Sequence, residues 1–115
     1  MSIQMSVDRI MPSISDIINR LEALKTRPIT HDVVKRLYRD AINLDETVGA
    51  LLSEEQFPKL IHCTLQARGY LWALLRNISE NLENPKEDNY RKRSNMVLAY
   101  MRQAKAALQL VTTED

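Results

Sequence analysis

Apolar residues recur along this chain in alternating steps of three and four, the spacing of a helix that buries one face. The first segment shows the heptad pattern most clearly, at Ile3, Val7, Ile10, Ile14, Ile17, Leu21 and Leu24. A strand would need alternation by two instead. The same period returns in three later segments, so the pattern predicts four amphipathic helices, over residues 2–25, 31–52, 58–82 and 85–111.

Three prolines separate these segments, at Pro28, Pro58 and Pro85. Because the residue before a proline is pushed out of the helical conformation, each marks a helix boundary. Thr30 precedes the second segment, where its hydroxyl can accept a hydrogen bond from a first-turn N–H as an N-cap. Pro12 lies inside the first segment, and we expect that helix to be kinked there, or broken and restarted at Ser13.

Similar lengths and short connections predict an all-α, antiparallel up-down-up-down four-helix bundle, built as one domain of residues 1–115. Two alternatives stay open: a three-helix bundle with the residues before Pro12 undocked, and a dimer that exchanges helices. The third segment is the most apolar, because five further apolar residues lie beside its central stripe: Ile61, Leu65, Trp72, Leu75 and Leu82. We expect its buried arc to be wider than in the other segments.

Composition narrows the class of protein. Sixteen basic against fifteen acidic residues give a net charge of +1, which argues against a dedicated nucleic-acid binder. Two glycines among 115 residues are too few for the turns of a β-sandwich, and one cysteine, Cys63, excludes an internal disulfide. With no apolar run of about 20 residues and no signal-peptide pattern, we expect a cytoplasmic protein that does not insert into a membrane.

Catalytic patterns are missing from the chain. It has no glycine-rich phosphate loop and no Glu-x-x-His pair, and His31 and His62 fall at distant levels of the predicted bundle, so we expect no metal and no cofactor. His62 and Cys63 are neighbours that point about 100° apart on a helix, so they form no nucleophile–base pair. We expect Cys63 to be a packed side chain and the protein not to be an enzyme.

The stretch from His62 to Gly69 resembles the histidine phosphotransfer domains, four-helix bundles that carry an exposed histidine with a glycine nearby. That family has lysine three and glycine four residues after the histidine. Here Leu65 and Gln66 occupy those positions, and the glycine follows three residues later. The resemblance implies phosphoryl transfer through His62, which we keep as the alternative to a solvated histidine.

Small residues on the third segment indicate a docking surface. Gly69 and Ala73 lie four apart on a polar strip that His62 and Gln66 continue, and this spacing lets another backbone approach closely. We therefore predict a protein-interaction module of adaptor, inhibitor or regulatory type, which binds a partner or a second copy through these four residues. The competing interpretation is that the first helix covers Gly69.

Two groups of charges complete the sequence-based hypotheses. Arg91, Lys92 and Arg93 with Arg102 form a basic patch, which we interpret as a solvated face, with an accessory nucleic-acid site as a weaker alternative.

Asp45 and Arg68 fall inside the apolar arcs of the second and third helices. An unpaired buried charge costs several kcal/mol, and antiparallel neighbours would bring the two level, so we predict a partly buried ion pair that fixes their register.

Overall fold

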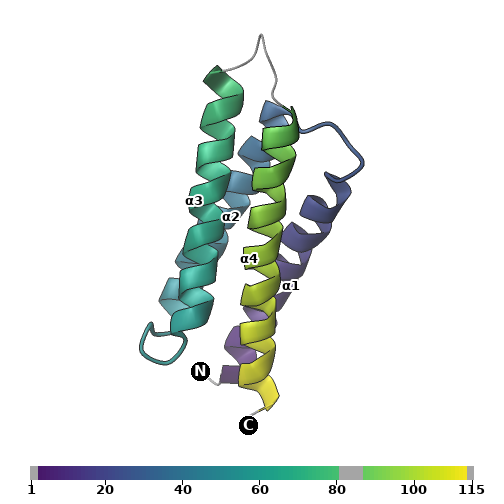
Figure 1. Ribbon diagram of the computed structural model, residues 1–115. Coiled ribbons are helices and arrows are strands. Elements are labelled where there is room, and N and C mark those ends of the chain that lie inside the picture. The colour runs from purple at the N-terminus through teal and green to yellow at the C-terminus, as the bar shows by residue number, and fades with distance from the viewer. Residues whose placement is uncertain (1–2, 81–86, 114–115) are drawn as a thin grey trace.

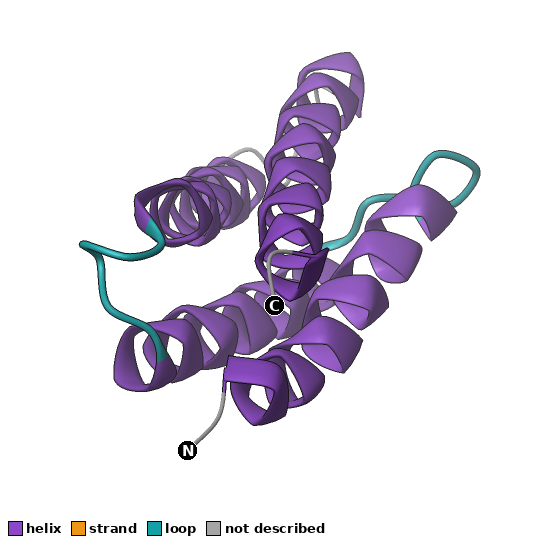
Figure 2. Cartoon of the chain, turned by 90° about the horizontal axis from the view of Figure 1, so that it is seen from below, coloured by secondary structure: helices purple, strands orange, loops and turns teal. Residues whose placement is uncertain are grey.

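The computed structural model describes residues 3–80 and 87–113, which form four helices. They are α1 (Ile3–Ala23), α2 (His31–Leu51), α3 (Pro58–Glu80) and α4 (Glu87–Thr113). Figures 1 and 2 show helices and connecting loops throughout this part of the chain, and no strand occurs in it. The all-α prediction is confirmed. The predicted start of the fourth helix at Pro85 lies outside the described residues.

Each helix packs against two of the other three. Both α1 and α3 contact α2 and α4, while α1 and α3 lie diagonally opposite each other without contact between their described residues. Figure 1 shows the two termini and the α2–α3 connection at one end of the molecule, and the α1–α2 connection at the other. The molecule is about 51 Å long and 23 by 18 Å across, which is the shape of a helical bundle.

The buried side chains are those that the heptad period selects. In α1 the stripe from Val7 to Leu24 is buried, and Ile10 and Ile14 expose nothing to solvent. The stripes of the other helices converge on the same cluster, which includes Val34, Leu37, Leu71, Leu74, Met101 and Leu108. Since every helix contributes one face, the core extends along the whole bundle, and apolar burial supplies most of its stability.

Helix α1 continues through Pro12 without a break. Val7 and Ile10, which precede the proline, are fully part of the core. The predicted restart at Ser13 and the three-helix alternative are therefore wrong. Pro12 is tolerated because its side chain is exposed, on the side of the helix away from the core.

The helix ends follow local capping rules. Thr30 has an extended backbone, and its hydroxyl accepts a hydrogen bond of 3.3 Å from the Val33 N–H, which confirms the predicted N-cap. Beyond the end of α1 the hydrogen bonds change to the spacing of a 3₁₀-helix, because the N–H groups of Leu24, Lys25 and Thr26 donate to carbonyls three residues earlier.

Candidate functional site

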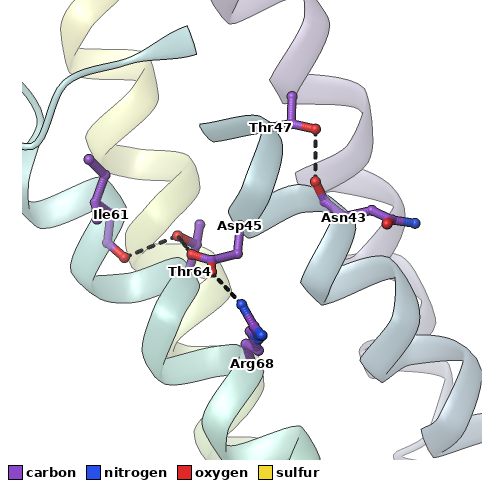
Figure 3. Close-up of polar contacts among 6 residues, drawn as sticks. All are labelled: Asn43, Asp45, Thr47, Ile61, Thr64 and Arg68. Atoms are coloured by element: carbon purple, nitrogen blue, oxygen red, sulfur yellow. Dashed lines mark hydrogen bonds and ion pairs between the residues drawn. The ribbon is translucent and has the colours of Figure 1, made fainter. Parts of the chain in front are cut away.

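Asp45 of α2 and Arg68 of α3, the two charges that the sequence predicts to pair, are in direct contact (Figure 3). Arg68 Nη1 donates to Asp45 Oδ2 at 2.9 Å. The Thr64 hydroxyl lies 3.3 Å from Asp45 Oδ1 and 3.1 Å from the Ile61 carbonyl oxygen, so it can donate to either acceptor. The Asp45 carboxylate therefore sits between two consecutive turns of α3.

This ion pair is partly wet. The Asp45 side chain is 16% exposed and that of Arg68 is 35% exposed. The hydrogen bond from Arg68 to Asp45 raises the pKa of the guanidinium, with a smaller contribution from the Tyr38 hydroxyl. The pair can therefore hold α2 and α3 in register.

Two large apolar side chains of α3 are exposed beside this pair. Leu65 is 51% and Trp72 48% exposed, so the expectation that both widen the buried arc of the third helix is wrong. The reason is the arrangement of the bundle: α3 contacts only α2 and α4, and no described helix covers its outward side. Both residues project from that uncovered side.

Gly69 lies between Leu65 and Trp72 and is open as well. A Cβ atom built on Gly69 would meet nothing within 4 Å. The competing expectation that the first helix covers Gly69 is wrong, because the described residues of α1 make no contact with α3 and Gly69 is exposed. A methyl group would therefore fit at this position, so glycine is not required here by packing inside the described chain.

A shallow depression of about 400 Å³ joins these residues across the boundary of α2 and α3. We call it the α2–α3 face and define it by its lining residues, Tyr38, Leu65, Arg68, Gly69 and Trp72. The floor is apolar and aromatic, and its one charged member, Arg68, is already neutralised by the carboxylate beneath it. An apolar surface with a few fixed polar groups is typical of a binding site.

The Trp72 ring is held in place from one side. The guanidinium carbon of Arg76 lies 5.5 Å from the centre of the ring, within the range of a cation–π contact. Glu80 in turn fixes Arg76, because Arg76 Nε donates to Glu80 Oε1 at 3.0 Å. These two contacts orient the Trp72 side chain.

The docking strip predicted from the sequence stays a prediction, and its four residues lie in different surroundings. His62 is exposed but its ring meets the edge of Tyr100 of α4, with centroids 6.4 Å apart. Tyr100 also stacks on Tyr70 at 5.6 Å. Gln66 lies one turn from each of these contacts and is half-buried, and so is Ala73. Of the four predicted residues, only Gly69 belongs to the α2–α3 face.

The predicted basic patch is divided too. Arg91 donates to the carbonyl oxygens of Leu24 (2.7 Å), Lys25 (3.3 Å) and Arg27 (3.4 Å), all beyond the end of α1. Arg102 forms an ion pair with Glu22 of α1. Two of the four cations thus join α4 to α1, while Lys92 is exposed and Arg93 half-buried. The interpretation of all four as a solvated face is wrong for Arg91.

A hollow of about 340 Å³ lies beside these arginines, between α1 and α4. Its apolar lining includes Leu24, Ile29 and Leu98. Arg91 is already bound to carbonyls just beyond α1 and Arg102 to Glu22, so an anion entering the hollow would have to displace a carbonyl or a carboxylate. This competition makes the hollow a weaker candidate site than the α2–α3 face.

Cys63 is buried, as predicted, and its thiol lies 3.8 Å from Gln103 Oε1 of α4. Burial raises the pKa of the Cys63 thiol, and the charge of Lys59 opposes this only in part, so the sulfur is protonated near neutral pH. Among residues 3–80 and 87–113, no three side chains able to bind a metal come together. None of the described helices has the length and apolar character needed to cross a bilayer.

Comparison with known proteins adds no relative: no family model, no curated protein and no solved structure matches this chain.

Proposed function

We propose that this chain is a non-enzymatic protein-interaction module and that it binds through the α2–α3 face. The exposure of Leu65 and Trp72 on either side of Gly69 carries the proposal. Clustered large apolar side chains on a protein surface mark interaction sites, whereas single ones are ordinary. Tryptophan in particular is enriched among the residues that dominate binding energy.

The scaffold that we propose for this module is the up-down-up-down antiparallel bundle, with a kink in α1 at Pro12. Contacts between neighbouring helices support the topology. Cys63 of α3 meets Gln103 of α4, and farther along α3 the Asn77 carbonyl accepts a hydrogen bond from the Tyr90 hydroxyl. Residue numbers rise along α3 as they fall along α4, which antiparallel neighbours require.

Rigidity of the face also supports the proposal. The ion pair between Asp45 and Arg68 joins the two helices beneath the depression, and Arg76 fixes the Trp72 ring above it. A surface that is ordered before binding loses less conformational entropy when a partner docks. The α2–α3 face therefore has both the apolar area and the stiffness of a binding site.

A matched pair of variants tests this function. The double variant Leu65→Ser/Trp72→Ser removes the apolar face, and Met96→Ser, on α4, removes an exposed apolar side chain elsewhere. A partner that the wild-type protein retains from an extract of the source cells is first purified. We expect this purified partner to bind the wild-type protein again. The double variant should bind it at least tenfold more weakly, and Met96→Ser as tightly as the wild type. Equal binding by all three proteins would refute the proposal.

The exposure of His62 favours one alternative, histidine phosphotransfer. Its imidazole is accessible to a phosphoryl donor even though Tyr100 packs against one edge. Incubation with phosphoramidate, which phosphorylates exposed histidines, tests this directly. An acid-labile phosphoryl group that His62→Gln loses and that passes to a response-regulator aspartate would replace the interaction module with a signalling protein.

A further inference from the structure

We infer that the α2–α3 face binds a second copy of this chain, face to face, with each helix antiparallel to its counterpart. This inference rests on the proposed function and names the partner of that same surface. Two pairs of residues, one on each helix, carry it. Each pair is complementary to itself under the two-fold rotation that such a dimer requires.

The first pair is Leu65 and Trp72 of α3. They are about two helical turns apart and therefore lie on the same side of the helix. If two copies of α3 cross antiparallel about a point midway between them, Leu65 of one copy meets Trp72 of the other. The rotation repeats the contact, so each exposed apolar side chain of the face is covered.

The second pair is Arg39 and Glu46 of α2, which are also about two turns apart. Both side chains are exposed, and neither forms an ion pair within the described part of the chain. Leu37 is buried and Tyr38 lines the α2–α3 face. The next residue is turned farther around the helix in the same direction, so Arg39 lies on the outward side of α2. Their charges are opposite, so antiparallel copies of α2 would bring Arg39 of one against Glu46 of the other, twice.

The two pairs share one level along the bundle. Asp45 contacts both Thr64 and Arg68, so it lies level with the middle of that turn of α3, near Gln66. Because α2 and α3 run antiparallel, one residue toward the start of α2 and one residue toward the end of α3 shift the level along the bundle by the same amount in the same direction. The midpoint of Arg39 and Glu46 then falls level with the bond between Arg68 and Gly69.

The bond between Arg68 and Gly69 is also the midpoint of Leu65 and Trp72. A single two-fold axis at this level therefore aligns both the apolar pair and the charged pair. A surface built for an unrelated partner has no need of this coincidence. Gly69 lies next to the axis, where two helices would approach most closely, and nothing within 4 Å fills the space of its missing side chain.

Size sets the expected affinity. Helices of 21 and 23 residues lying side by side, with lengths near 33 Å and a combined width near 20 Å, offer roughly 650 Å² per copy. Stable interfaces bury about 800 Å² per partner, so this dimer belongs to the weaker class. We therefore expect a dissociation constant in the micromolar range.

Charge exchange tests the inference. In the homodimer, Arg39→Glu and Glu46→Arg each place like charges against one another. Each variant alone should therefore dimerise at least tenfold more weakly in analytical ultracentrifugation. An equimolar mixture of the two places opposite charges at both contacts and should restore the dimer. The double variant Arg39→Glu/Glu46→Arg should dimerise like the wild type. Arg36→Glu, an exposed change on the same helix, is the control and should leave the dimer intact.

Trp72, the sole tryptophan of the chain, gives a second readout. Its emission should shift to the blue and become less accessible to acrylamide as the wild-type concentration rises through the dissociation constant. A monomeric wild type at several hundred micromolar overturns the inference, as do single variants that dimerise normally or a mixture that stays monomeric. None of these results touches the proposed function, which fails only if Leu65→Ser/Trp72→Ser binds a partner as the wild type does.

Discussion

Arg91 Nη1 of α4 lies 2.7 Å from the carbonyl oxygen of Leu24, one residue beyond the end of α1. The last carbonyls of a helix have no amide partners of their own, and they carry the negative end of its dipole. A guanidinium satisfies both needs, since it donates several hydrogen bonds and is positive. Arg91 thus acts as a C-terminal cap for a helix that lies 67 residues earlier in the chain.

Replacing this arginine should destabilise the bundle. We expect Arg91→Ala to lower the free energy of unfolding by about 1–3 kcal/mol, because it removes the donor from the part-buried Leu24 carbonyl. Lys92→Ala, an exposed change on the same turn, should stay within about 0.5 kcal/mol of the wild type. Urea unfolding followed by circular dichroism measures both, and equal stability of the two variants would show that the cap contributes nothing.

The Asp45–Arg68 pair should behave as a unit. Asp45→Ala leaves a cation without its partner, yet the 35% exposed guanidinium can turn toward water. We therefore expect a loss of about 1–3 kcal/mol, below the 3–5 kcal/mol typical of a deeply buried pair. Asp45→Ala/Arg68→Met should recover part of this loss. A double variant whose loss in urea unfolding equals the sum of the two single losses would contradict the coupling.

Stability should fall in alkaline solution through Cys63. Burial raises the pKa of its thiol above the ordinary value of 9.0, although Lys59 opposes the rise. Above that value the unfolded chain loses the thiol proton before the folded one, so the free energy of unfolding decreases with pH until the folded thiol ionises too. Cys63→Ala should remove this component, and the difference between the two curves from pH 7 to pH 11 isolates it. Parallel curves would show that the thiol is not shielded.

Alanine at Gly69 should stabilise the monomer. Nothing within 4 Å would meet the added methyl group. In a helix interior, alanine is more stable than glycine by about 0.5–1 kcal/mol. Gly49→Ala provides the match in α2, where the space is equally open. Thermal unfolding at low micromolar concentration should show a higher midpoint for both variants. A lower midpoint for Gly69→Ala alone would reveal a contact at that position.

The helices were predictable because their signals are local. Proline spacing and the heptad stripe placed the start of α2 and the core positions of α1 correctly and the end of α2 within one residue, and Thr30 was predicted as the N-cap that it forms. The contact between Asp45 and Arg68 could be anticipated for a different reason: two charges inside apolar arcs need a partner, and antiparallel neighbours leave few choices.

The binding surface was harder to read from the sequence. Hydrophobicity alone assigns Leu65 and Trp72 to the core, whereas their exposure depends on which sides of α3 the neighbouring helices cover. A helical projection gives a usable signal, because both residues lie well away from the line of Leu71 and Leu74. The role of Arg91 had no such signal, since the end of α1 that it caps is distant in sequence.

The position of α1 between α2 and α4 also bears on how the chain acquires its structure during synthesis. Ribosomes deliver α1 first and α4 after the other three helices, so the apolar stripe from Val7 to Leu24 has only α2 beside it for most of translation. Its closure, together with the bond between Arg91 and Leu24, must wait until α4 has left the exit tunnel. A nascent chain stalled before residue 87 should therefore hold α1 exposed to chaperones and proteases, and a chain released with α4 complete should bury it.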